Sequence, residues 1–220
     1  MKSMNKSELI ENIKREKLIV IVRGVGRDDL PALADALYSG GVRLMEITFD
    51  KSGKTPPHLT AENIRILKEH TRGRMHIGAG TVTTPEEVEL VADAGGEFII
   101  SPDTCEEVIR RTVELGLVSI PGALTPTEAA SAHRFGADFV KLFPVEGLGV
   151  SYVKAIRAPL SQISFLAVGG VGLDNIKDYM NTGISGVGIG SAIIDKELIR
   201  RGEFEKITAL AREYVEALGG

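Results

Sequence analysis

Residues 75–101, MHIGAGTVTTPEEVELVADAGGEFIIS, contain one complete strand–helix–strand unit. Met75–Gly80 is a short apolar run of the kind that forms a buried strand. Thr84–Glu87 then supplies a helix cap, a first-turn proline and early acidic residues, and Gly95-Gly96 marks the end of that helix. Phe98–Ser101 begins the next apolar strand. This order predicts parallel strands joined by a helix.

The same unit recurs along the whole chain. The predicted strands are mostly continuous Val/Ile-rich runs, as expected for parallel strands covered on both faces: Leu18–Arg23, Leu44–Phe49, Met75–Gly80, Phe98–Ser101, Val118–Pro121, Phe139–Phe143, Ile163–Val168 and Gly186–Gly190. The predicted helices are Asp28–Ser39, Thr60–His70, Pro85–Ala94, Cys105–Leu115, Pro126–Phe135, Val150–Ala158, Asp174–Met180 and Phe204–Leu218.

This alternation predicts an α/β protein, a single (β/α)8 TIM barrel over residues 1–220 with a short N-terminal helix. An open doubly wound sheet is the alternative. Its dinucleotide-binding form is disfavoured because no Gly-x-Gly-x-x-Gly follows the first strand.

Composition excludes several classes of protein. A net charge of −4 without a basic, aromatic-rich cluster argues against nucleic-acid binding. No apolar run is long enough to span a membrane, and the stretch that begins at Met1 carries Glu and Lys instead of a secretory signal. The single Cys105 fits a reducing compartment. We therefore expect a cytoplasmic protein.

Lys141 is the most informative residue, because it lies inside the apolar run Ala137–Pro144. Burial lowers the pKa of a lysine and leaves free amine near neutral pH, and such an amine can form a Schiff base with a carbonyl compound. The structural alternative is a lysine whose stem is buried while its ammonium reaches the surface.

Two further charged residues stand at predicted strand ends, where TIM barrels place their active sites. Glu46 lies inside an apolar strand, so its pKa should be raised and it could transfer protons; a structural ion pair, even with Lys141, is the alternative. Arg23 would enter the barrel mouth and could bind a substrate carboxylate, or form a salt bridge at the rim.

Glycines after the last two strands predict an anion site. Gly169-Gly170 and Gly188–Ala192 would expose backbone amides, with a short helix starting at Ser191. The four histidines have no ligand spacing, and His76 falls at the opposite end of the barrel, so we expect no metal.

These motifs together resemble the 2-keto-3-deoxy-6-phosphogluconate (KDPG) / 4-hydroxy-2-oxoglutarate (KHG) aldolases over nearly the whole chain. The matching segments are Ile21–Gly24, Met45–Thr48, Gly78–Val82, Ile100–Pro102, Ile120–Gly122, Val140–Pro144, Gly169–Val171 and Gly190–Ala192. The resemblance implies a cofactor-free class I aldolase, a homotrimer in the usual case, that cleaves a small-molecule 2-keto-4-hydroxy acid to pyruvate and an aldehyde, either glyceraldehyde 3-phosphate or glyoxylate.

The resemblance also implies the role of each site residue. Lys141 would form the Schiff base, and Glu46 would be the general acid/base. The remaining positions would bind the pyruvyl end (Arg23, Thr81), line the apolar wall (Pro102, Phe143) and contact a distal phosphate (Gly169, Gly170, Gly190, Ser191).

The chain departs from the commonest family pattern in places. Val168 stands where many members have threonine, Asp50 where some have arginine, and the loop Lys51–Leu59 is longer than usual. These changes leave the aldehyde partner open. Two other functions are alternatives: an epimerase or isomerase that uses Glu46 and Lys141 as acid and base, and a silent phosphate-metabolite binder in which Val168 and Asp50 mark a decayed site.

Overall fold

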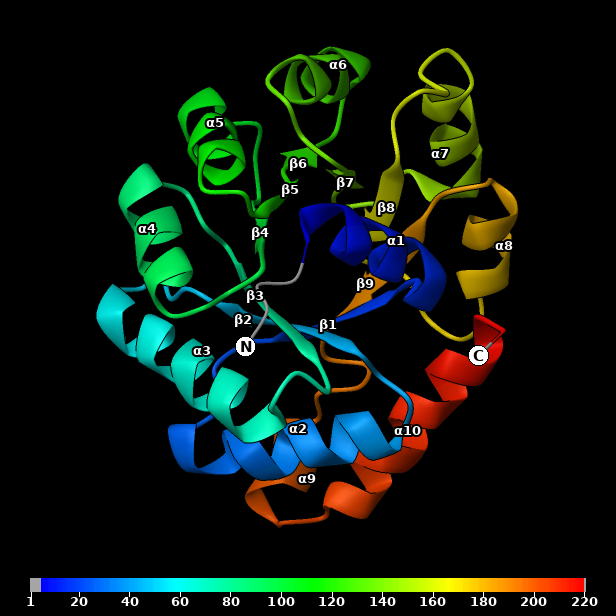
Figure 1. Ribbon diagram of the computed structural model, residues 1–220. Helices are drawn as coiled ribbons and strands as arrows, with labels where there is room; N and C mark the ends of the chain where they lie inside the picture. Colours follow the sequence, from blue (N-terminus) through cyan, green and yellow to red (C-terminus); the bar gives the residue numbers. More distant parts are fainter. Residues whose placement is uncertain (1–4, 220) are drawn as a thin grey trace.

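The strands form one parallel sheet that closes into a barrel (Figure 1). The computed structural model describes residues 5–219; residues 1–4, where the stretch without a secretory signal begins, and residue 220 lie outside it. The strands are β1 (Leu18–Val22), β2 (Leu44–Thr48), β3 (His76–Gly80), β4 (Phe98–Ile100), β5 (Val118–Ile120), β6 (Gly122–Ala123), β7 (Val140–Leu142), β8 (Phe165–Val168) and β9 (Gly186–Ile189).

Closure of the barrel depends on the segment that contains β5 and β6. β5 falls within the predicted strand Val118–Pro121, whereas β6 follows Pro121 and was not predicted. β5 pairs with β4, β6 pairs with β7, and β9 pairs with β1. The amide of Lys141 donates to the Pro121 carbonyl at 2.8 Å, so the position between β5 and β6 stays bonded to β7. The predicted TIM barrel is confirmed, and the open sheet is wrong.

Helices surround the barrel as a ring, with the N-terminal helix lying across one end instead (Figure 1). They are α1 (Lys6–Glu16), α2 (Leu30–Ser39), α3 (Pro57–Thr71), α4 (Pro85–Asp93), α5 (Glu106–Glu114), α6 (Pro126–Arg134), α7 (Gly149–Arg157), α8 (Ile176–Asn181), α9 (Lys196–Arg200) and α10 (Phe204–Ala217), with a 3-10 turn η1 (Arg27–Asp29). Of the helices formed by residues 5–219, none has the length and apolar character to cross a membrane.

Two of the predicted helix starts differ from the structure for clear local reasons. The segment predicted to begin at Asp28 forms η1 first, and α2 begins at Leu30 with a proline in its first turn. α3 begins at Pro57 rather than Thr60, because a proline is well accommodated where the first amides need no helical partner. The cap predicted at Thr84 is confirmed, and Thr125 caps α6 in the same way.

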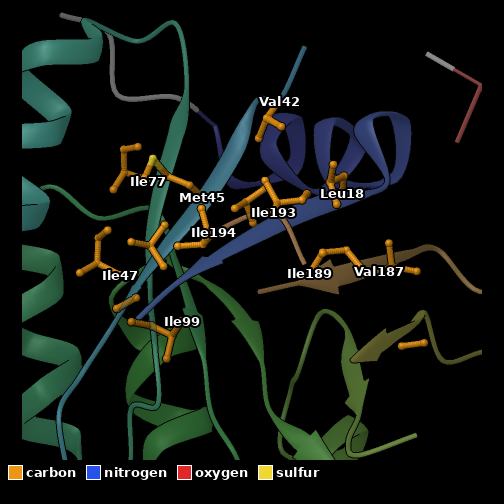
Figure 2. Packing of buried hydrophobic residues seen from close by; sticks show 14 of the residues in the cluster. Leu18, Val42, Met45, Ile47, Ile77, Ile99, Val187, Ile189, Ile193 and Ile194 are labelled. Atoms are coloured by element: carbon orange, nitrogen blue, oxygen red, sulfur yellow. The ribbon is translucent and has the colours of Figure 1, made fainter. Parts of the chain in front are cut away.

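Side chains alternate along the strands between two apolar layers. The outward layer packs against the helices, and Figure 2 shows part of it, including Met45 and Ile47 of β2 and Ile77 of β3. The inward layer fills the barrel with Ile19, Leu44, Phe98, Ile100, Val118, Ile120, Phe139 and Leu166. Parallel strands buried on both faces account for the continuous apolar runs in the sequence.

The N-terminal helix α1 closes one end of the barrel (Figure 1). Its Leu9 and Ile13 are buried in the inward layer. His76, at the start of β3, lies at this closed end, with a ring nitrogen 3.2 Å from Asn12 of α1 and the other 3.3 Å from Glu97. The catalytic groups are therefore expected at the opposite rim, where the strands end.

Candidate active site

The parallel sheet brings the predicted site residues to one rim of the barrel. Glu46 and Lys141 lie within β2 and β7, and the others follow strand ends. Arg23 follows β1, Thr81 follows β3, Pro102 follows β4, Phe143 follows β7, Gly169 and Gly170 follow β8, and Gly190 and Ser191 follow β9.

Lys141 points into the apolar interior of the barrel. The residue is 7% exposed, and its neighbours around a small void of about 10 Å³ include Ile100, Ile120 and Leu166. Burial lowers the pKa of its amine; the Glu46 carboxylate opposes this shift, and Arg23 adds to it. The amine lies 4.7 Å from the centre of the Phe143 ring. The side chain therefore does not carry its amine into open solvent.

Glu46 is a buried carboxyl group without a close partner. The residue is 3% exposed, and its Oε2 accepts no hydrogen bond. Burial raises its pKa from 4.5 to about 7, although the positive charges of Lys141 and Arg23 act in the opposite direction. Among residues 5–219 no ion pair within 4.0 Å includes it. Glu46 and Lys141 thus interact electrostatically without forming the ion pair that was the structural alternative.

A glycine in the neighbouring strand makes room for this carboxyl group. Thr48 pairs with Gly80 in the β2–β3 register, and a Cβ atom on Gly80 would overlap the Glu46 carboxylate. The Gly78–Val82 segment was singled out from the sequence, but the reason for its second glycine appears only when β2 and β3 lie side by side.

Arg23 and Thr81 meet at the mouth of the barrel. The Arg23 Nη2 donates a hydrogen bond to Thr81 Oγ1 at 3.1 Å. Arg23 is exposed and makes no ion pair with any acidic residue in the described part of the chain. Thr81 has a φ of +58°, a left-handed conformation that a β-branched residue rarely adopts. Such backbone strain is typical of binding sites, and here it presents the hydroxyl to Arg23.

Pro102 and Phe143 lie on the same side of the mouth as Lys141. Phe143 is 37% exposed, so its ring can contact a molecule bound at the amine. Pro102 is partly buried, and its carbonyl lies where a Cβ on Gly122 would be. Asp103, the next residue, was not identified from the sequence; its charge raises the pKa of Lys141. Only its position after β4 could have indicated this role.

The glycine loops after β8 and β9 are partly as predicted. Gly169 and Gly170 have φ values of +84° and +88°, and the Asn175 side chain bonds the Gly170 carbonyl and the Gly172 amide, each at 2.9 Å. This side chain fixes the loop.

The predicted helix start at Ser191 was wrong. Gly190 instead begins a turn in which its carbonyl accepts from the Ile194 amide at 2.9 Å. The helix α9 starts at Lys196, and the Asp195 carboxylate already accepts its first amides, from Glu197 and Leu198. Any anion site here would use the turn around Gly190 and Ser191.

The departures from the family pattern have clear positions. Val168 is 7% exposed and lies against the same small void as Lys141, and Gly188 leaves the space that its methyl groups occupy. Asp50 accepts from the amides of Ser52 and Thr55 at 2.8 and 2.9 Å, and hydrogen bonds from Ser52 lower its pKa to about 2. Its charge is therefore used to fold its own loop.

The comparisons agree with this geometry. A family model described as "KDPG and KHG aldolase" matches residues 9–210. The Escherichia coli 2-dehydro-3-deoxy-6-phosphogalactonate aldolase is 35% identical over 91% of this chain and 93% of its own. The Haemophilus influenzae 2-dehydro-3-deoxy-phosphogluconate aldolase is 31% identical over 98% and 99%. A Legionella pneumophila KDPG aldolase, solved with pyruvate captured as a covalent carbinolamine, superposes with a TM-score of 0.83 at 27% identity, over 96% of this chain and 98% of that one.

Proposed function

The chain belongs to the KDPG and KHG aldolase family and is thus an aldolase, a lyase, and from this premise we propose that Lys141 forms a Schiff base with a 2-keto-4-hydroxy acid. One observation carries the proposal: a buried amine with a lowered pKa shares the barrel interior with a buried carboxyl group with a pKa of about 7. These are the nucleophile and the proton-transfer group that imine chemistry requires.

The reaction follows from these groups. The neutral amine of Lys141 adds to the C2 carbonyl, and the carbinolamine loses water to give an iminium ion. The Glu46 carboxylate, directly or through a water molecule, takes the proton of the C4 hydroxyl. The C3–C4 bond then breaks, its electron pair moves toward the iminium to form an enamine, and the aldehyde leaves. Protonation at C3 and hydrolysis release pyruvate and restore Lys141.

The remaining residues would hold the substrate. Arg23 and Thr81, already joined by a hydrogen bond, would bind the pyruvyl carboxylate and keto end. Pro102 and Phe143 would form the apolar wall beside the imine. A distal phosphate would contact the positive-φ glycines Gly169 and Gly170 and the turn at Gly190 and Ser191.

We assign the substrate class as 2-keto-3-deoxy-6-phospho sugar acids, with 4-hydroxy-2-oxoglutarate as the shorter alternative. The relatives include aldolases for the gluconate-derived and galactonate-derived acids, which differ at C4. Val168 removes a hydroxyl donor from the strand end nearest Lys141, so we expect it to influence that choice. Because the chain belongs to an aldolase family, we favour the aldolase over the epimerase or isomerase and over the silent metabolite binder.

A substrate panel tests the proposal. Purified protein is incubated with each C4 epimer of the 6-phospho acid, with both enantiomers of 4-hydroxy-2-oxoglutarate and with the unphosphorylated sugar acids, and pyruvate is measured by a coupled assay. We expect release from at least one phosphorylated acid. If every compound stays intact, the assigned substrate class is wrong. The single domain of residues 1–220, the homotrimer, the cytoplasmic location and the lack of a cofactor stay predictions.

A further inference from the structure

A second cavity lies beside the predicted imine site. It has a volume of about 650 Å³ and is lined by the ends of β1 and β2, the loop after β2, Thr81 and Lys196. Arg23, Lys51, Lys54 and Lys196 are its cations, and Asp50 also lines it. Hydroxyl groups of threonine and serine residues form much of the remaining polar lining: Thr48, Ser52, Thr55, Thr60 and Thr81.

Three of these cations, Arg23, Lys54 and Lys196, have no acidic partner among the described residues. Among residues 5–219, Arg23, Lys54 and Lys196 take part in no ion pair within 4.0 Å. The other charged residues that line the cavity already have partners. Lys51 pairs with the Glu87 carboxylate, and Asp50 accepts from the amides of its own loop. A cavity that gathers unpaired cations and hydroxyl donors fits an oxyanion better than any other ligand.

Lys196 reaches the cavity from a distant part of the sequence. It is the first residue of α9, and its Nζ would lie 3.0 Å from a Cβ atom on Gly24. Gly24 has none, and its φ of +64° is a conformation that favours glycine. The ammonium therefore lies against the backbone next to Arg23, in a space that a side chain at position 24 would restrict.

The cavity is electrostatically connected to the proposed reaction centre. The charge of Arg23 lowers the pKa of both Glu46 and Lys141, so an anion bound at Arg23 lies within electrostatic reach of both groups. Thr48, on the inward face of β2 two residues after Glu46, also lines the cavity. A substrate held at Lys141 can therefore place one of its charged ends here.

We propose that Lys196 and Lys54, together with Arg23, form an oxyanion subsite for a charged end of the substrate, and that Lys196 is a specificity-determining residue. This inference rests on the proposed aldolase function. The carboxylate of the keto acid and the phosphate of the aldehyde share this chemistry, and the experiment below distinguishes them.

The test compares Lys196→Met and Lys54→Met with wild type and with Lys177→Met. Lys177 is an exposed lysine of α8 outside the cavity, so its variant loses the same charge without touching the subsite. Borohydride inactivation is measured against pyruvate concentration. If the carboxylate is the ligand, the pyruvate concentration that gives half-maximal inactivation rises about 5- to 10-fold in Lys196→Met. This change lies between the contribution of an exposed ion pair and that of a hydrogen bond to a charged group. The rate at saturation stays unchanged.

The second arm measures aldol condensation with glyceraldehyde 3-phosphate and with glyceraldehyde. If the phosphate is the ligand, the KM for the phosphorylated aldehyde alone rises in the lysine variants. Either result supports the subsite and names its ligand, and raised salt should reduce the difference. Unchanged constants in both arms would overturn the inference.

Failure of the proposed function has a different signature, because wild type itself would show no pyruvate-dependent inactivation. Calorimetric titration with pyruvate and with inorganic phosphate then tests the subsite without any Schiff base. Weaker binding of either anion to Lys196→Met supports it. Equal binding to all variants, or no binding at all, refutes it.

Discussion

Replacing Glu46 with glutamine should make the enzyme slower. It should also remove the loss of stability that wild type shows as the pH rises. Glutamine keeps the shape of the side chain and cannot accept a proton. Loss of one general acid/base should lower turnover by at least about 10²-fold. A wild-type rate in this variant would return Glu46 to a structural role.

The stability effect follows from the pKa of the buried carboxyl group. Its pKa is about 7 in the folded protein against an ordinary value of 4.5. A raised pKa means that the folded state favours the protonated form, so wild type has its full stability below pH 4.5 and loses part of it as the pH rises through 7. One such group lowers the free energy of unfolding of wild type by about 3 kcal/mol between pH 4 and pH 8. Glutamine has no such dependence.

Denaturant unfolding at pH 4, 5, 6, 7 and 8 measures this difference. The free energy of unfolding of Glu46→Gln, relative to wild type, should increase by about 3 kcal/mol across the range. Any constant cost of burying the amide cancels, because only the change with pH is compared. Glu69→Gln, an exposed carboxylate of α3, is the matched control and should follow wild type. A pH-independent difference for Glu46→Gln would refute the argument that this carboxyl group is desolvated and available near pH 7.

Three further predictions concern the chemistry directly. Borohydride with pyruvate should inactivate the protein and add a pyruvate-derived mass to Lys141, seen by peptide mass spectrometry; label on another lysine would contradict the mechanism. A chelator should leave activity intact, and activity lost to it and restored by a divalent metal would show a metal requirement. Val168→Thr should raise kcat/KM for KDPG, because a hydrogen bond to a charged group is worth about 10- to 150-fold. Wild type should cleave KDPG slowly. Fast wild-type cleavage without a gain in the threonine variant would show that Val168 costs nothing.

The barrel could be predicted because its information is local. Most strands are short apolar runs, and several helices carry their own start or stop signals, as at Thr84, Thr125 and Gly95. The short helix predicted to start at Ser191 was misplaced, since the five residues of α9, Lys196–Arg200, are too few to show a helical period. β6 was missed because the predicted strand ended at Pro121, and only the pairing with β7 defines Gly122–Ala123 as a strand.

The site was predictable only as a set of residues at strand ends. Ionisable side chains inside apolar runs identified Lys141 and Glu46, whose burial the structure shows. What they contact depends on residues far away in the sequence, such as Gly80 beside Glu46 and Asp103 near Lys141. The roles of Lys196 and Asp50 could not be predicted either, since a single charged residue outside an apolar run carries no sequence signal until the cavity or the loop amides around it are known.

The charges at the rim form a system that substrate binding should adjust. Burial already lowers the pKa of Lys141 and raises that of Glu46 to about 7, so burial favours the uncharged form of each group. Arg23 helps to keep Lys141 a free amine, since its positive charge disfavours the ammonium. A substrate carboxylate at Arg23 would cancel part of that charge and so stabilise the cationic iminium formed next. The same cancellation would make Glu46 a stronger base when the C4 hydroxyl proton has to leave. The arginine thus favours the amine before binding, and its neutralisation favours the intermediate afterwards, which is the order of events that an imine-forming aldolase needs.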